Sequence, residues 1–230
     1  MLAAGIVGVA TTPASSDPTR PWTKARRGVG LGVQRVLWSA PAGTASLTFD
    51  DGPYPALTPH VLDVLDRYGI PATFMLIGAF AAAHPALVED IVGRGHAIGN
   101  HTWTHRDLTS LDPDEVRLEL QRTHDQLSRH ADITLFRPPR GQLSGVALQA
   151  AAELGYDVVL WSTEELEPIV DGTLAVWHDG LGRGGFLAED DPERERRHAD
   201  RVSQIDALPA AIEAALGAGV RFVPVASLVK

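Results

Sequence analysis

The amino-acid sequence predicts an α/β fold, specifically an irregular (β/α) barrel of about seven parallel strands in a single domain. From residue 45 onward, short apolar runs with strand-like composition alternate with segments of helical period. Such alternation is typical of parallel sheets whose strands are joined by helical crossovers. The chain has 230 residues, which is enough for one large core, and α/β barrels of this size usually form one domain.

The expected strands are short runs rich in β-branched and apolar residues. They lie at residues 45–49, 72–78, 96–100, 133–136, 157–161, 173–177 and 221–225.

The first expected helix follows the first of these strands. Leu57, Val61 and Leu65 share one face at helical spacing. Thr58 is the expected N-cap, with Pro59 at the first helical position.

Two further helices have clear terminal signals. One is expected to begin at Asp112, which forms a capping-box pattern with Glu115. Another covers residues 205–219 and ends in glycines, which favour helix termination. The basic run at residues 194–201 is interleaved with acids, and we interpret it as a solvated helix face.

One connection does not fit the barrel pattern. Only residues 163–172 separate two expected strands, whereas a parallel crossover normally needs a dozen residues or more with a helix. We therefore expect a truncated crossover there.

The N-terminal residues 1–28 are expected to be a tail, or the remnant of a signal or anchor, before a catalytic domain at residues 29–230. Their apolar run is shorter than the roughly 20 residues needed to cross a bilayer. It also lacks the cationic start of a full signal peptide. We expect no transmembrane span in the chain, and a secreted or cell-envelope protein.

Composition restricts the classes of partner and site. The net charge of −9 argues against a nucleic-acid partner, because phosphate binding needs clustered lysine and arginine. The chain has no cysteine, so any metal must be held by histidine, aspartate or glutamate.

Polar motifs directly follow five of the expected strands. In chain order they read FDDGP, HTWTH, RPPRG, WSTEELE and WHDG. Because the C-terminal ends of parallel barrel strands open onto one face, these motifs should converge there. This convergence is the main indication of an enzyme.

The adjacent acids Asp50 and Asp51 need a break in strand geometry to act together, since successive strand side chains point to opposite faces. If the chain leaves the strand at Gly52-Pro53, the two carboxylates can converge. One could then bind a metal while the other takes a proton from a water molecule.

A histidine pair could complete the metal site. His101 and His105 share a face if residues 101–105 form a helical turn, which Asn100 could cap. One aspartate and two histidines would leave a coordination position open, as catalytic zinc sites require.

The motifs TFDDGP, HTWTH, RPPRG and LAVWHDG, in this order, resemble those of the polysaccharide deacetylase family, also called the NodB-homology domain or carbohydrate esterase family 4. The resemblance covers roughly residues 44–229. It implies an irregular (β/α) barrel that hydrolyses acetamide groups on N-acetylglucosamine polymers such as chitin or peptidoglycan, or acetyl esters on xylan.

The resemblance also implies roles for individual residues. Asp50 would be the general base and His178 the general acid. Arg137 would orient Asp50, and backbone amides of its loop would face the substrate. One divalent metal ion, most often Zn²⁺ and alternatively Co²⁺, would be held by Asp51, His101 and His105.

The substrate side departs from the family pattern. Pro139, Arg140, Gly141 and Trp161 are expected to contact the glycan, and Arg140 stands where the family often has an aromatic residue. An Asp-Trp pair of the family is replaced by Glu167 and Pro168, so Glu167 is expected to pair with Arg137 or to orient His178. Trp161 or Trp177 would then supply the missing apolar wall.

Three functions remain open at this point. The leading one is a metal-dependent N-deacetylase acting on an N-acetylated glycan of cell-wall or chitin type. The alternatives are an O-acetyl esterase acting on xylan, and a glycan-binding protein of this fold with impaired catalysis. The sequence leaves the oligomeric state undetermined.

Overall fold

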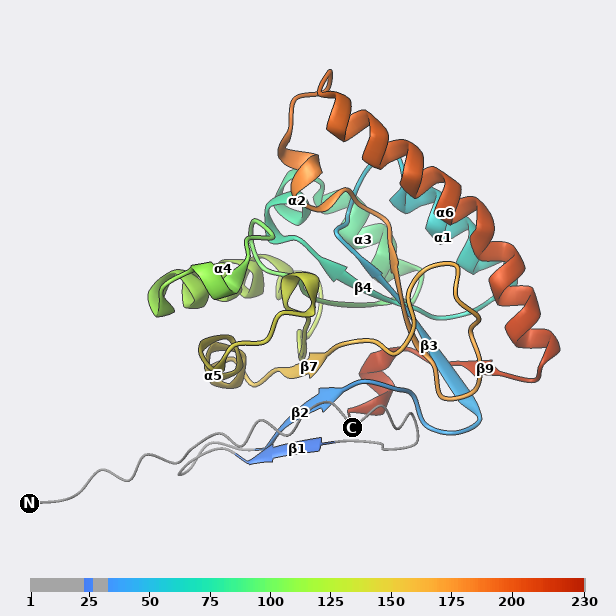
Figure 1. Ribbon diagram of the computed structural model, residues 1–230, viewed down its shortest axis with the longest axis horizontal. Helices are drawn as coiled ribbons and strands as arrows, with labels where there is room; N and C mark the ends of the chain where they lie inside the picture. The colour runs from blue at the N-terminus through green and yellow to red at the C-terminus, as the bar shows by residue number, and fades with distance from the viewer. Residues whose placement is uncertain (1–22, 27–32, 230) are drawn as a thin grey trace, which may run out of the picture.

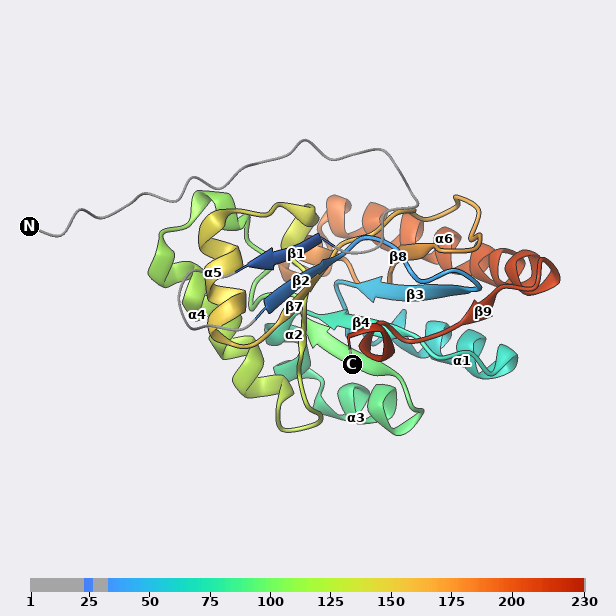
Figure 2. The same ribbon diagram turned by 90° about the horizontal axis from the view of Figure 1, so that it is seen from below.

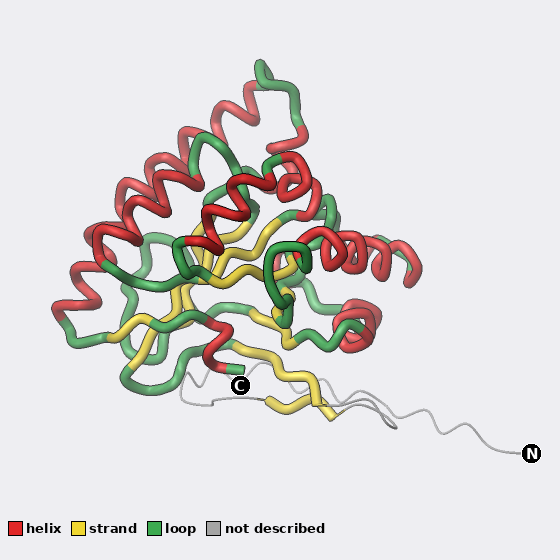
Figure 3. The backbone as a smooth tube through the Cα atoms, turned by 180° about the vertical axis from the view of Figure 1, so that it is seen from behind, coloured by secondary structure: helices red, strands yellow, loops and turns green. Residues whose placement is uncertain are grey.

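The computed structural model describes residues 23–26 and 33–229. Within them nine strands form one sheet in the order β1-β2-β7-β6-β5-β4-β3-β8, with β9 paired to β3. Figure 3 shows most of the strands in the middle of the molecule with helices around them, and two strands at one edge. The strands are β1 (Thr23–Arg26), β2 (Val33–Leu37), β3 (Thr44–Asp50), β4 (Thr73–Leu76), β5 (Ala97–Asn100), β6 (Leu135–Phe136), β7 (Asp157–Val159), β8 (Leu174–His178) and β9 (Arg221–Phe222).

Six α-helices and four short 3₁₀ turns connect these strands in the part of the chain that is described. The helices are α1 (Thr58–Tyr68), α2 (Gly78–Ala83), α3 (Pro85–Gly93), α4 (Pro113–Leu127), α5 (Gly145–Glu153) and α6 (Pro192–Gly217). The 3₁₀ turns are η1 (Leu108–Ser110), η2 (Pro139–Gly141), η3 (Gly182–Phe186) and η4 (Val225–Leu228). None of the helices in the described residues is long and apolar enough to cross a membrane. Figures 1 and 2 show the long α6 running beside α1.

The sheet bends back on itself to form the expected irregular barrel. Thr163, just after β7, forms a parallel bridge with Ala175 of β8. The amide of Ser162 donates to the carbonyl of Leu174, and that of Val176 to Thr163, each at 2.9 Å. The intervening link contains no helix, as predicted from its length. The predicted fold class is therefore confirmed.

All seven predicted strands are present as β3 to β9, several of them shorter than expected. Two further strands, β1 and β2, are not predicted from the sequence. They pair antiparallel with each other, and β2 also pairs parallel with β7. Residues 23–26, expected to belong to the tail, form a strand. The other residues of that tail, 1–22 and 27–28, lie outside the described residues.

Strand β3 is buried along its whole length because β4 and β8 flank it and helices cover it. Leu47 and Phe49 face the main core, where the ring of Phe49 stacks on Phe74 at 5.1 Å. The alternate side chains, Thr48 and Asp50, point into the barrel. Period-two alternation therefore brings Asp50 inside, toward the ends of the neighbouring strands.

The helix termini match the sequence signals in one case and differ in another. Asp112 and Glu115 form the predicted capping box of α4. In α1, however, the N-cap is Leu57, and Thr58 is the first helical residue. The Thr58 hydroxyl accepts from the Tyr54 amide at 2.8 Å and donates to Asp179 at 2.5 Å. The predicted capping role of Thr58 is therefore wrong, because its hydroxyl has these other partners.

Candidate active site

The residues predicted to act in catalysis and metal binding gather around one hollow at the C-terminal ends of the strands, as expected for a parallel barrel. Asp50 ends β3 and His178 ends β8, and these two residues are paired across the two strands. His101 follows β5 and Arg137 follows β6. The hollow has a volume of about 280 Å³. Its lining residues are Asp50, Asp51, His101, His105, Arg140, Trp161, Glu164, Glu165, Val176, His178, Gly182, Arg183, Arg197 and Arg201.

The two adjacent acids converge because Asp51 leaves strand geometry, with a φ of 75° in the left-handed region. The break comes one residue earlier than expected, before the cis peptide between Gly52 and Pro53. As a result Asp50 Oδ2 lies 3.7 Å and Asp51 Oδ1 lies 3.5 Å from the same atom, His101 Nε2.

A buried third acid, Asp179, packs against this turn and was missed by the sequence analysis. A Cβ atom at Gly52 would lie 2.3 Å from Asp179 Oδ2, and one at Gly180 would lie 2.0 Å from the Asp51 carbonyl oxygen. Both positions therefore require glycine. Burial raises the pKa of Asp179 to about 7, so its carboxyl is partly protonated near neutral pH.

The two histidines converge through a tight loop, so the predicted helical turn at residues 101–105 is wrong. Thr102 and His105 have positive φ values of 66° and 55°. Asn100 accepts a hydrogen bond from the Thr102 amide at 2.9 Å. Glu119 of α4 accepts from the amide and hydroxyl of Thr104, at 2.8 and 2.6 Å. Hydrogen bonds from these side chains stabilise the loop, instead of the backbone hydrogen bonds of a helix.

Asp51, His101 and His105 fit a divalent metal ion. Each offers one ligand atom, and the three atoms lie within 4.8 Å of one another. Asp51 Oδ1 is 3.5 Å from His101 Nε2 and 3.2 Å from His105 Nε2. Ligands about 2.1 Å from a tetrahedral ion would be about 3.4 Å apart. The buried Asp51 Oδ1 has no hydrogen-bond donor among the described residues.

The hydrogen bonds and pKa values of these ligands also favour the binding of a cation. His101 Nδ1 donates to the Arg137 carbonyl at 2.8 Å, which orients the ring with Nε2 toward Asp51 as the ligand atom. Burial lowers the pKa of His105 to about 4, so this ring is neutral at pH 7. Burial alone would raise the pKa of Asp51, but the neighbouring histidines outweigh it and hold the pKa well below its ordinary value. The site therefore presents one carboxylate and the neutral imidazole of His105, with His101 Nε2 beside them.

Arg137 is fully buried and fixes Asp50 beside this cluster. Its Nη1 donates to Asp50 Oδ1 at 2.5 Å and to Thr48 at 2.8 Å. The remaining guanidinium nitrogens donate to the carbonyls of Val159 and Leu160. All three nitrogens of this rigid planar group are hydrogen-bonded, and Asp50 keeps one oxygen facing the hollow. The predicted pairing of Arg137 with Asp50 is confirmed.

Comparison with known proteins now identifies the family. The profile for polysaccharide deacetylase matches residues 39–159, just over half of the chain. The chain belongs to the polysaccharide deacetylase family. The matched segment includes both aspartates, both histidines of the cluster and Arg137, whereas His178 lies beyond it.

Individual members of the family show similarity over different lengths. A chitooligosaccharide deacetylase of Sinorhizobium fredii is 39% identical over 58% of this chain and 67% of its own length. A peptidoglycan-N-acetylglucosamine deacetylase of Bacillus cereus is 38% identical over 53% of this chain and 45% of its own length. The structure of a family 4 carbohydrate esterase from Bacillus anthracis has a TM-score of 0.66 and 27% identity, over 84% of this chain and 86% of that one.

His178 is oriented by Glu165, which the sequence analysis missed. Its Nδ1 is hydrogen-bonded to the Glu165 carboxylate, which also accepts from Arg201 of α6 at 3.2 Å. Burial alone would lower the pKa of His178, but Glu165 outweighs it and the pKa is raised above its ordinary value. His178 is thus suited to donate a proton near neutral pH.

The prediction that Glu167 contacts Arg137 or His178 is wrong. Leu166 has a φ of 68°, which turns the chain so that Glu165 points inward and Glu167 outward. The exposed Glu167 accepts from the Glu164 amide at 2.9 Å. Glu165 occupies the orienting position that was assigned to Glu167.

Replacing Glu165 by glutamine should shift the alkaline limb of the pH–rate profile to lower pH. An acid catalyst must be protonated, and removing the carboxylate lowers the pKa of His178, so activity is lost earlier as pH rises. Rates of a Glu165→Gln variant measured between pH 5 and 10 test this expectation, with Glu167→Gln as the matched control. An unshifted limb would show that Glu165 does not set the protonation of His178.

The four residues expected to contact the glycan have different surroundings. Arg140 and Trp161 line the hollow, and Gly141 lies under the Trp161 ring, where a Cβ would be 2.7 Å from the ring. Pro139 is buried. The amide of Gly141 donates to the Pro138 carbonyl at 3.0 Å, so this one amide of the loop is not free for a substrate. Trp177 is buried, which leaves Trp161 as the apolar wall.

Proposed function

We propose that the protein removes N-acetyl groups from an N-acetylglucosamine-containing polysaccharide, using one divalent metal ion, Zn²⁺ foremost. One observation carries this proposal: Asp51, His101 and His105 form a three-ligand cluster, while the adjacent Asp50 is held beside it by Arg137. Three protein ligands leave a position open for water or substrate.

Each side chain has a defined part in amide hydrolysis. The ion, when bound, polarises the acetyl carbonyl and makes water more acidic. Asp50 accepts the proton of the attacking water through Oδ2, since Oδ1 is occupied by Arg137. His178 donates its proton to the amine that leaves, and Glu165 holds the imidazole in place for this transfer. Trp161 forms an apolar wall of the hollow, where a sugar ring can stack.

The relatives support this substrate class. Their names describe deacetylases of chitooligosaccharide and of peptidoglycan N-acetylglucosamine. We infer a similar N-acetylated glycan for this chain and, because such polymers lie outside the cytoplasm, a secreted or envelope-associated protein. The Glu165–His178 pair removes one of the two reasons to expect impaired catalysis, the replacement of the family's Asp-Trp pair by Glu167 and Pro168. The other reason, the short link at residues 163–172, remains.

Acetate release from N-acetylglucosamine hexamers tests the proposal. We expect turnover with zinc, loss of turnover after exhaustive removal of metal by a chelator, and recovery on adding zinc back. Undiminished turnover in metal-free protein would overturn the mechanism, and no turnover on any acetylated glycan would overturn the activity.

Replacing His178 by alanine should separate amide from ester hydrolysis. An amine leaves poorly without a proton whereas an alcohol leaves more readily, so the amide rate should fall by about 10²–10⁴-fold and the ester rate by much less. Acetate release from N-acetylglucosamine hexamers and from acetylated xylan gives the comparison. Equal losses on both would show that His178 does not protonate the leaving group.

A further inference from the structure

Four arginines from three separate segments line the catalytic hollow of a chain whose net charge is −9. Arg140 belongs to the turn after β6, Arg183 to the turn after β8, and Arg197 and Arg201 to α6. Between β6 and β8 the sheet contains β5, β4 and β3, so Arg140 and Arg183 reach the hollow from different sides.

Two of these four arginines are already paired with acids. Arg201 donates to Glu165 at 3.2 Å, and Arg197 donates to Glu193 at 2.7 and 2.9 Å. Neither Arg140 nor Arg183 has a hydrogen bond or an ion pair with any residue in the described ranges. Arg140 interacts only at longer range with Asp107, whose pKa it helps to lower after the hydrogen bonds from Thr109.

The acids of the hollow do not balance these two free cations. Asp50 is paired with Arg137, and Glu165 with His178 and Arg201. Asp51 faces the two histidines of the metal cluster. This leaves Glu164, which accepts from the Trp161 ring nitrogen at 3.3 Å. Outside these pairs and the metal cluster, two free guanidinium groups face one free carboxylate, so this part of the hollow is locally positive.

Arg183 also lines a second hollow of about 560 Å³ next to the first. Arg197 is shared between the two hollows as well. The second hollow contains the exposed ring of Phe186, which stacks on Phe80 at 4.5 Å and is held by that contact. An aromatic face beside a free guanidinium suits a sugar ring that carries an anionic substituent.

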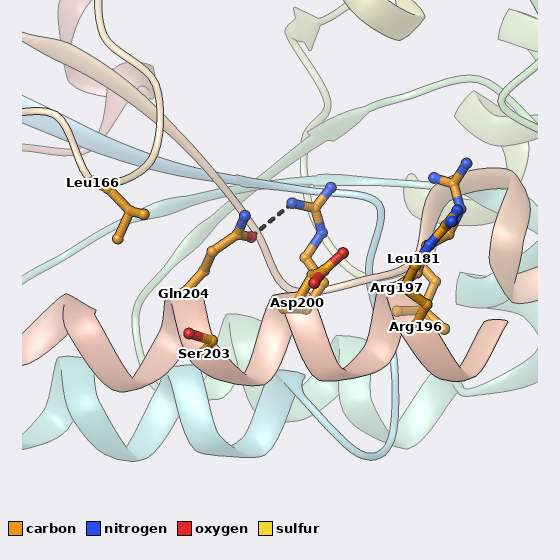
Figure 4. A pocket seen from close by; sticks show the side chains of 8 residues that line it. Leu166, Leu181, Arg196, Arg197, Asp200, Ser203 and Gln204 are labelled. Atoms are coloured by element: carbon orange, nitrogen blue, oxygen red, sulfur yellow. Dashed lines mark hydrogen bonds between the residues drawn. The ribbon is translucent and has the colours of Figure 1, made fainter. Parts of the chain in front are cut away.

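A third hollow, of about 480 Å³, lies along α6 on the side of Leu166. Figure 4 shows Gln204, Asp200 and Arg197 in a row on the helix, with Leu166 opposite them. Asp200 offsets the arginines there, and the hollow contains none of the metal-cluster residues. Arg196 of that hollow lies away from the metal cluster, so the positive charge without a partner that lies beside the catalytic residues is that of Arg183 and Arg140.

We propose that the preferred substrate is an anionic amino-sugar polymer, and that Arg183 binds a carboxylate on a sugar adjacent to the one that is deacetylated. This inference rests on the proposed deacetylase function and specifies its substrate class. A lactyl carboxylate on the sugar ring, as in N-acetylmuramic acid, has the required chemistry. Arg183 and Phe186 form the subsite, while Arg140 adds positive charge at the other side of the hollow.

The test compares three tetrasaccharides at low ionic strength. The first alternates N-acetylglucosamine with N-acetylmuramic acid, the second is the same compound with its carboxylates converted to neutral amides, and the third contains N-acetylglucosamine alone. We expect kcat/KM to be about 10-fold higher for the first than for the second, since a hydrogen bond to a charged group contributes this much. The preference should shrink as salt is added.

An Arg183→Gln variant should remove most of this preference, and Arg183→Glu should reverse it. Arg129→Gln is the matched control, because Arg129 is exposed, lies outside all these hollows and has no ion pair among the described residues. Equal kcat/KM for the first two compounds, or a preference that survives Arg183→Glu, would overturn the inference and leave the deacetylase function intact. Failure to release acetate from all three compounds would instead overturn the deacetylase function.

Discussion

An Asp50→Asn variant should lose at least about 10³-fold in the rate of acetate release, at the upper part of the range for removal of a general base. Asparagine has nearly the same size and its carbonyl oxygen can still accept from Arg137, so the geometry of the site should be kept, although the buried Arg137 loses its charged partner and some stability is lost. The amide cannot take a proton from water at neutral pH, which removes the base.

The measurement is the initial rate on N-acetylglucosamine hexamers, together with the zinc content of the same sample. We expect Asp50→Asn to bind zinc as the parent does, because Asp51, His101 and His105 are unchanged. A variant that keeps more than a tenth of the parent activity with full zinc would show that another group is the base.

An Arg137→Leu variant should lower the free energy of unfolding by about 3–5 kcal/mol, which is typical when one partner of a buried ion pair is removed. Asp50 would become a buried charge without its partner, and the carbonyls of Val159 and Leu160 would lose a buried donor. Activity should fall as well, because Arg137 fixes the orientation of Asp50.

Urea denaturation of four proteins checks this expectation: the parent, Arg137→Leu, Asp50→Asn and the double variant. In the Asp50→Asn background, Arg137→Leu should lower the free energy of unfolding by less, since no buried carboxylate is left without a partner. The difference between the two values measures the coupling between the two residues. A loss below about 1 kcal/mol for Arg137→Leu alone would contradict the buried pair.

Much of the fold and half of the site could be predicted because local patterns decide them. Apolar runs of β-branched residues mark the buried parallel strands, and in a parallel barrel the residues after each strand must gather at one end. This reasoning brings Asp50, His101, Arg137 and His178 together without any knowledge of long-range contacts. β1 and β2 could not be predicted in this way, because β1 depends on pairing with β2 and its residues show no apolar alternation.

In the loops, the sequence shows which segments contribute to the site but not which of their side chains point into it. Nothing in the sequence distinguishes Glu165 from Glu167 as the partner of His178, because the choice depends on the positive φ of Leu166. The histidine pair was expected on a helical turn, whereas its geometry comes from Glu119 and Asn100, which hold a loop of irregular backbone. Asp179 is not one of the three residues of the metal cluster. Only the packing shows that its carboxyl fills the space beside Gly52.

The central claim is that Asp51, His101 and His105 hold a metal ion while Asp50 remains free of it. The most direct measurement is anomalous diffraction at the zinc absorption edge from crystals grown with zinc. We expect one ion about 2.0–2.2 Å from one Asp51 oxygen and the two Nε2 atoms, with Asp50 close by and still bonded to Arg137. An ion held elsewhere, no ion at saturating zinc, or direct ligation by Asp50 would contradict it.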